Sequence, residues 1–256
     1  NERGTLVYSR IKSKEASEKI VYNTLTVPVR ERFQLVLADG TKVFLNSGSE
    51  MRYPERFGKA RREVFLKGEA WFEVAKDSAR EFWVHAGAMD VKVLGTSFNV
   101  KAYERLETVA TTLVEGSVEV ACAGKSFQIV PGEQFVYDKN NRVMDVRMVD
   151  TESYVSWKDG YYKFRQTTLE EIMETLSVWY GLNVFYVNES AKQVEFTGKV
   201  KRYEDARMLL DKFEQTGDVV FDIKGNNVFI TIKQKKPFAR EWNSFLVKAR
   251  GMVWQS

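Results

Sequence analysis

Cysteine, histidine and proline are scarce in this chain of 256 residues, and each shortage excludes a class of structure or site. The single cysteine, Cys122, has no partner for a disulfide within the chain. With one histidine, His85, the chain cannot build a zinc site from several Cys and His ligands, and any Ser-His-Asp or Cys-His system would depend on that residue. Four prolines and 16 glycines are too few for a fibrous or disordered chain, so the sequence predicts a globular protein.

Long apolar runs and an excess of one charge are also missing from most of the chain. No stretch approaches the roughly 20 consecutive apolar residues of a membrane helix. The net charge of +4 comes from 39 basic and 35 acidic residues, and the excess lies in the tail from Lys233 to Ser256. Without that tail the chain has 33 basic and 34 acidic residues, so we expect no nucleic-acid partner.

From Phe33 to about Val146 the sequence reads as one short strand after another. Asp39-Gly40 separates two alternating apolar runs and predicts a tight hairpin, because both residues tolerate positive φ angles. Further apolar runs are separated by turn residues: Gly68, Gly87, Gly95, Gly116, Gly124 and Pro131-Gly132. We therefore predict that residues 24–150 form an all-β roll, sandwich or solenoid-like domain.

The pattern changes near Asp150, and we place a linker at 151–156 and a small α+β domain at 157–235. Trp157 to Phe164 reads as a strand. Thr168 and Glu171 then fit a capping box at the start of an apolar helical stripe that ends at Gly181.

A second helical stripe, from Ala206 to Phe213, repeats the first one 37 residues later, and the strands after the two stripes repeat at the same distance. Residues 157–232 are therefore interpreted as a duplicated strand-helix-strand unit. Residues 236–256 are a basic, aromatic tail for which a short helix, a docked strand and disorder all remain open.

No residue pattern predicts catalysis, and we expect no enzyme activity, cofactor or metal. His85 fits a surface position near the end of a strand, and Cys122 fits a small buried hydrophobic position. Glu69 and Glu73 flank Trp71-Phe72, but carboxylates at solvated strand edges explain that pair better than a catalytic site does. A nucleotide-binding loop, a nucleophile elbow and an acidic calcium loop are all missing. The sequence favours a binding or signal-transmitting protein.

Five motifs, in order, carry a resemblance to a known family: DGTKVFLNSGS, GEAWFEV, VKVLGTSFNV, LVEGSVEV and PGEQ. The chain resembles the FecR-like regulators of extracytoplasmic-function sigma factors over about residues 23–235. The C-terminal part is similar to the last domain of the family's common gut-bacterial form, through Trp157, Gly160, Phe164, Leu169, Leu176, Trp179-Tyr180-Gly181, Phe196 and Gly198. The family usually has glycine in the turn before its first core strand, where this chain has Val29-Arg30-Glu31.

The resemblance implies the periplasmic sensor portion of an anti-sigma factor tethered to the inner membrane. Its expected partners are the N-terminal signalling domain of a TonB-dependent outer-membrane receptor and, through a cytoplasmic segment outside this sequence, a sigma factor. Residues 1–23 would then be a linker from a removed membrane segment. The small domain resembles the short N-terminal domains of secretins and of those receptors. It could therefore add a partner strand at an open sheet edge. We place that edge at the last strand, on Val228, Phe229, Ile230, Thr231 and Ile232.

The sequence leaves two other functions open. The many aromatic residues also fit a carbohydrate- or cell-wall-binding β domain without a signalling role, which burial of both Trp71 and Trp83 would weaken. An unrecognised hydrolase would require acidic residues with strongly perturbed pKa values in one cleft.

Overall fold

The computed structural model describes residues 5–7, 20–202, 205–215 and 218–233. The predicted tail at 236–256 and most of the predicted linker at 1–23 lie outside these residues. Within that linker, strand β1 (Thr5–Val7) pairs in parallel with β3. No helix among the described residues is long and apolar enough to cross a membrane.

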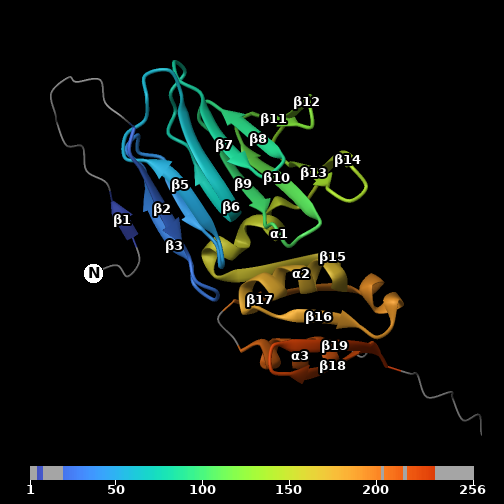
Figure 1. The fold of residues 1–256 in the computed structure, drawn as a ribbon. Helices are drawn as coiled ribbons and strands as arrows, with labels where there is room; N and C mark the ends of the chain where they lie inside the picture. The colour runs from blue at the N-terminus through green and yellow to red at the C-terminus, as the bar shows by residue number, and fades with distance from the viewer. Residues whose placement is uncertain (1–4, 8–19, 203–204, 216–217, 234–256) are drawn as a thin grey trace, which may run out of the picture.

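Residues 20–150, which we call the β region, fold into one large sheet that wraps around a shared core (Figure 1). The strands are β2 (Tyr22–Thr26), β3 (Phe33–Val36), β4 (Lys42–Leu45), β5 (Glu50–Pro54), β6 (Arg62–Glu73), β7 (Phe82–Ala86), β8 (Met89–Val93), β9 (Ser97–Ala102), β10 (Thr108–Glu115), β11 (Val118–Cys122), β12 (Lys125–Ile129), β13 (Glu133–Asp138) and β14 (Val143–Met148). The main strand order is β12-β11-β8-β7-β6-β9-β10-β13-β14, with β1 to β5 attached to one another and to β6. This confirms the predicted all-β architecture.

The long strand β6 connects the two halves of the sheet. Its first half pairs with β5 and β7, and its second half pairs with β4 and β9. Gly68 lies where the strand passes from one half to the other, with φ of +109°, and a Cβ there would lie 2.4 Å from Ser49 Oγ. The expectation that Gly68 separates two strands is therefore wrong: the glycine permits a close approach within one strand.

The interior of the β region is apolar, as the alternating sequence pattern predicts. Phe72 and Phe98 face each other on β6 and β9, fully buried, with ring centroids 5.2 Å apart. Cys122 is buried in the same core, as predicted. The Asp39-Gly40 hairpin is also confirmed, between β3 and β4 with Gly40 at φ of +88°.

Residues 151–233, the C-terminal region, form a small α+β unit below the β region in Figure 1. Its elements are α1 (Thr151–Val155), the 3₁₀ helix η1 (Ser156–Asp159), β15 (Tyr161–Thr168), α2 (Leu169–Tyr180), β16 (Asn183–Tyr186), the 3₁₀ helix η2 (Glu189–Gln193), β17 (Glu195–Lys201), α3 (Ala206–Gln215), β18 (Val219–Lys224) and β19 (Asn227–Ile232). The predicted linker at 151–156 is thus helical. The strand expected from Trp157 starts only at Tyr161.

Both predicted helices form, and the ends of the first are as the sequence indicates. The Thr168 hydroxyl accepts a hydrogen bond from the Glu171 backbone N–H, and Gly181 ends α2 with φ of +68°. The buried residues of α2 and α3 pack with those of β18 and β19 in one core. The two helices occupy the positions that the 37-residue repeat predicts.

The strand order corrects the predicted binding edge. The three-stranded sheet has the order β16-β19-β18, so β19 is central, parallel to β16 and antiparallel to β18. Val228 and Ile230 are fully buried. β19, the last strand of the described residues, therefore offers no free edge, because it is inserted between two strands that precede it.

Candidate functional site at the junction of the two regions

The outer face of β6 and β9 is covered by the C-terminal region. In this antiparallel pair Glu69 lies opposite Lys101 and Trp71 opposite Asn99, so these four side chains share the face away from the apolar core. Glu69 is 8% exposed and Trp71 4% exposed, and Trp71 belongs to the hydrophobic core of the C-terminal region. The expectation that Glu69 is a solvated strand-edge carboxylate is therefore wrong, because a second layer packs on this face.

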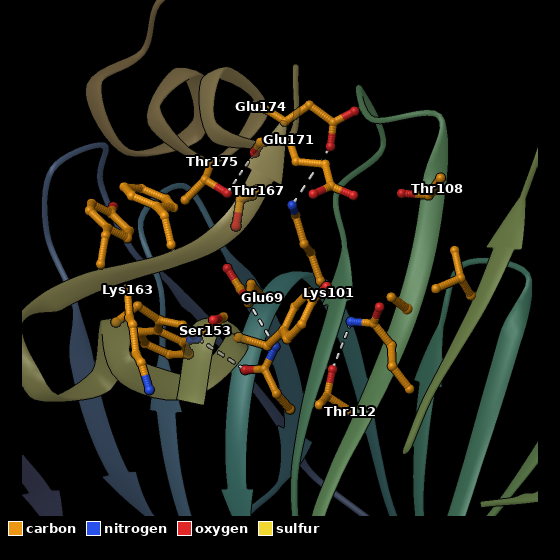
Figure 2. A pocket seen from close by; sticks show the side chains of 18 of the residues that line it. Glu69, Lys101, Thr108, Thr112, Ser153, Lys163, Thr167, Glu171, Glu174 and Thr175 are labelled. Atoms are coloured by element: carbon orange, nitrogen blue, oxygen red, sulfur yellow. Dashed lines mark hydrogen bonds and ion pairs between the residues drawn. The ribbon is translucent and has the colours of Figure 1, made fainter. Parts of the chain in front are cut away.

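Glu69 is held by two asparagine side chains. Asn46 Nδ2 donates to Glu69 Oε2 at 2.6 Å, and Asn99 Nδ2 donates to Oε1 at 2.9 Å (Figure 2 shows the second bond). Trp157 Nε1, from the C-terminal region, donates to Asn99 Oδ1 at 3.1 Å. Each amide thus binds the carboxylate with its nitrogen and uses its oxygen for another donor.

Arg202 completes this network from the C-terminal side and is fully buried. Its Nη1 donates to the Trp157 carbonyl at 2.8 Å, and its Nη2 donates to Asn46 Oδ1 across the junction. The guanidinium lies 3.4 Å from the ring centroid of Trp179. We call Asn46, Glu69, Asn99, Trp157 and Arg202 the junction network. It connects a buried cation to a buried carboxylate through Asn46.

Serine and tyrosine hydroxyls add further bonds beside the network. Ser47 Oγ lies 3.3 Å from the carbonyl oxygens of Val178 and Trp179 at the end of α2. Tyr103 donates to the Ser47 carbonyl at 2.8 Å, and burial raises the pKa of this tyrosine well above its usual value. The two regions are therefore joined by directional bonds as well as by apolar contact.

A cavity of about 200 Å³ lies beside the network, between the β region and α1, β15 and α2. In Figure 2, Lys101 points from its strand toward Glu174 and Glu171 of α2. Lys101 Nζ is 3.8 Å from Glu174 Oε2, and Arg147 Nη2 is 4.0 Å from Glu171 Oε1. Burial raises the pKa of Glu174, and the positive charge of Lys101 opposes that shift.

A second cavity, of about 250 Å³, shares Arg147, Ser153, Tyr154, Thr167 and Glu171 with the first. It reaches a bulge in β15, where the pairing register with β17 shifts between Phe164 and Thr167. The two cavities are therefore parts of one cleft along the junction.

The structure gives the other candidate residues structural roles. His85 lies near the end of β7 on its outward-facing side, as expected, with its side chain 27% exposed. Its Nδ1 is 2.7 Å from Asp90 Oδ1, and its ring stacks on Phe65. Among the described residues, no group of three or more His, Cys, Asp or Glu side chains is arranged to hold a metal ion. Of the five residues predicted to bind a partner, Phe229 and Thr231 alternate with buried Val228 and Ile230 and so lie on the sheet face away from the core.

Sequence reasoning missed the junction network. Asn46 and Asn99 lie inside two of the five family motifs, DGTKVFLNSGS and VKVLGTSFNV, but the motifs do not indicate what these side chains bind. For Asn99 the available signal was its outward position on a strand, because asparagine is disfavoured in strands. Asn46 follows the last residue of β4 and had no such signal. Arg202 had no such signal.

Comparison with known protein families gives two matches, in the order of the two regions. The model of the FecR protein matches residues 23–119, and the model of the FecR C-terminal domain matches residues 161–230. Together they cover about two thirds of the chain.

The chain belongs to the FecR-like anti-sigma factor family.

Two crystal structures of a protein from Parabacteroides distasonis, provisionally described as an anti-sigma factor, resemble this FecR-like chain. In both cases the TM-score is 0.75 and the sequence identity 27%. The matches cover 83% and 84% of this chain and 100% of the other. The comparison with curated proteins gave no match. These similarities support a role as a regulator of a sigma factor.

Proposed function

We propose that this FecR-like chain is the periplasmic sensor portion of a transmembrane anti-sigma factor. It would relay the state of a TonB-dependent outer-membrane receptor to an extracytoplasmic-function sigma factor. A membrane anchor and a cytoplasmic segment that holds the sigma factor would lie upstream of residue 1 in the full protein. The observation that carries this proposal is an apolar sheet face on the C-terminal region that points away from the core. The junction network joins the C-terminal region to the β region, so contact at this face could be transmitted between the two regions.

The proposed contact face lies on the three-stranded sheet, on the side opposite α2 and α3. Phe185, Val187 and Val220 are 47%, 62% and 39% exposed, and Phe185 stacks on Phe229 with ring centroids 5.1 Å apart. An apolar face of this kind suits contact with another protein.

The edge of the sheet supports the same location. β16 pairs with β19 on one side and with no strand of the described residues on the other. At the opposite edge, the backbone N–H of Phe221 in β18 donates to the Glu214 side chain. We therefore place the receptor's signalling domain on the β16 edge and the adjoining apolar face, where its backbone could extend the sheet.

Calorimetric titration of the full chain with the signalling domain of the cognate TonB-dependent receptor tests this function. We expect saturable one-to-one binding that Phe185→Glu or Phe229→Glu weakens at least tenfold. Val143→Glu is the matched control, because Val143 is 56% exposed on β14 of the β region. The relay is refuted if the wild-type chain shows no binding at high micromolar concentration, and the location is refuted if all three variants bind equally.

The carbohydrate-binding alternative gains no support from the aromatic residues. Trp71 lies under the C-terminal region and offers no face to a sugar. Trp83 is half-buried, with Nε1 donating to Glu81 and Lys92 placed 5.7 Å from the ring centroid. Of the two tryptophans whose burial would weaken the alternative, Trp71 is buried and Trp83 is only partly covered.

A further inference from the structure

Two positive side chains of the β region face two carboxylates of α2 across the junction cavity. Lys101 and Arg147 lie on one wall, and Glu174 and Glu171 on the other. Their N–O separations of 3.8 and 4.0 Å exceed the 2.7–3.2 Å of a hydrogen bond. Each pair is therefore an ion pair without a direct hydrogen bond.

The space between the walls suits a small molecule. A volume of about 200 Å³ is below the roughly 300–1,000 Å³ of pockets for drug-sized ligands. Ala110, Val136, Tyr154 and Phe164 supply an apolar part of the lining. The cavity thus offers paired charges and apolar surface together, at a junction of two folded regions where ligand sites are common.

Two further features lie on the same cleft. The Ser153 hydroxyl is buried and has no hydrogen-bond partner among the described residues, although it lines both cavities. Gln166, in the β15 bulge beside the second cavity, has φ of +48°, which is uncommon for a residue other than glycine. Unsatisfied buried hydroxyls, bulges and strained backbone are each enriched at functional sites.

We propose that the junction cavity binds a small zwitterion, a free amino acid or a dipeptide. The carboxylate of the ligand would lie at Lys101 and Arg147, its ammonium group at Glu174 and Glu171, and its carbon chain on the apolar lining. A ligand with both charges matches both walls, whereas an anion would face the two glutamates and a neutral sugar would bring no charge to either wall. This site is separate from the proposed receptor contact on β16.

The proposal is tested by calorimetry and NMR titration of the full chain with L-alanine, L-leucine and glycylglycine up to 10 mM. At least one of the three is expected to bind saturably, with shifts centred on Lys101 and Glu174. For the probe that binds, the N-acetylated form and the C-terminal amide lack one charge each and should bind at least tenfold more weakly. Lys101→Met and Glu174→Gln should each weaken binding at least tenfold.

Matched controls are Lys192→Met and Glu189→Gln, which remove an ion pair of 2.8 Å elsewhere in the C-terminal region and should leave binding unchanged. Three results would overturn the proposal: no binding by any of the three probes, equal binding of the N-acetylated or amidated form, or saturable binding of glucose at the same residues in place of the zwitterions. Because receptor binding is measured separately, its failure and the failure of this site can be told apart.

Discussion

Each of the two regions contributes one fully buried arginine to the described part of the chain, and the two arginines are held differently. Arg62, at the start of β6, has Nη1 2.9 Å from Asp39 Oδ2 and donates to the carbonyls of Ala75 and Arg80. All these partners belong to the β region. Arg202, after β17, donates to Trp157 in its own region and to Asn46 in the other.

The difference shows two uses of the same side chain. A buried charge whose partners lie in one region stabilises that region alone. A buried charge whose partners lie in both regions makes the stability of each depend on the other, because separating them would leave polar groups desolvated and unpaired. The core of the β region needs only apolar residues of suitable size, whereas the junction needs specific donors and acceptors in fixed positions.

The largest loss is expected for Arg62→Met. It leaves the Asp39 carboxylate, only 5% exposed, without its cation, and we expect the free energy of unfolding to fall by about 3–5 kcal/mol. Urea unfolding measures this. The neighbouring Arg61→Met is the control, since the Arg61 side chain is 57% exposed and its loss should change stability by less than about 0.5 kcal/mol. Equal effects of the two variants would show that the buried pair contributes nothing special.

For Arg202→Met we expect the free energy of unfolding to fall by a smaller amount, about 2–3 kcal/mol. The Asn46 side-chain oxygen and the Trp157 carbonyl each lose a hydrogen-bond donor, and the cation–π contact with Trp179 is lost. Hydrogen exchange should rise on both sides of the junction, while amides in the core of β6 and β9 stay protected. Arg202→Lys should fall between the wild type and Met, since an ammonium group cannot reproduce the planar fork.

The matched control for Arg202 is Arg207→Met, on the exposed surface of α3. If Arg202→Met increased amide hydrogen exchange only in the C-terminal region, the proposed difference between the two arginines would be wrong, because Arg202 would then stabilise only its own region, as Arg62 does.

For Arg30→Gly we expect the free energy of unfolding to rise by about 0.5–1 kcal/mol. Arg30 has φ of +70° in the turn where the family usually has glycine, and its N–H, which the variant keeps, donates to Ser47 Oγ at 2.9 Å. Glycine removes the strain of the left-handed conformation, worth about 1–2 kcal/mol. Part of this stabilisation is offset because glycine gives the unfolded chain more conformational entropy. Thermal unfolding measures the change. Arg30→Ala should give no gain, and a gain from alanine would refute strain as the cause.

The smallest effect is expected for Glu174→Gln, and it depends on pH. Burial raises the pKa of Glu174 in the folded state, so the protonated form is favoured there and its stabilisation is lost as pH rises through the folded pKa. The glutamine variant should therefore match the wild type near pH 3 and exceed its stability at pH 7. Urea unfolding at the two values tests this, with Glu189→Gln as an exposed control. A larger stability gain of the glutamine variant at pH 3 than at pH 7 would contradict a raised pKa of Glu174 in the folded state.

Most of the fold could be predicted because it depends on local signals. The Asp39-Gly40 turn, the Thr168 cap and the Gly181 helix end each act over a few residues and each formed as expected. The position of β19 could not be predicted in this way, because a strand's place in the sheet depends on pairing between distant segments. The high apolar content of NVFITI was a usable signal for a central strand.

The junction could not be predicted because an outward polar face looks the same whether water or protein covers it. Glu69, Asn99 and Lys101 alternate with core residues as solvated side chains would. Only the packing of the C-terminal region on that face turned Glu69 into a buried group. Family motifs marked Asn46 and Asn99 without indicating what they bind.

The distance along the chain between the two sides of the junction network has a consequence for biosynthesis. Asn46 and Arg202 are separated by 156 positions. At about 5–20 residues per second, on the order of ten seconds or more pass on the ribosome between the synthesis of the two. The face carrying Trp71 and Glu69 is complete only once β9 has been made, and it then stays uncovered for the rest of that interval. The nascent β region therefore exposes a partly apolar surface that the later part of its own chain must cover before another molecule binds it.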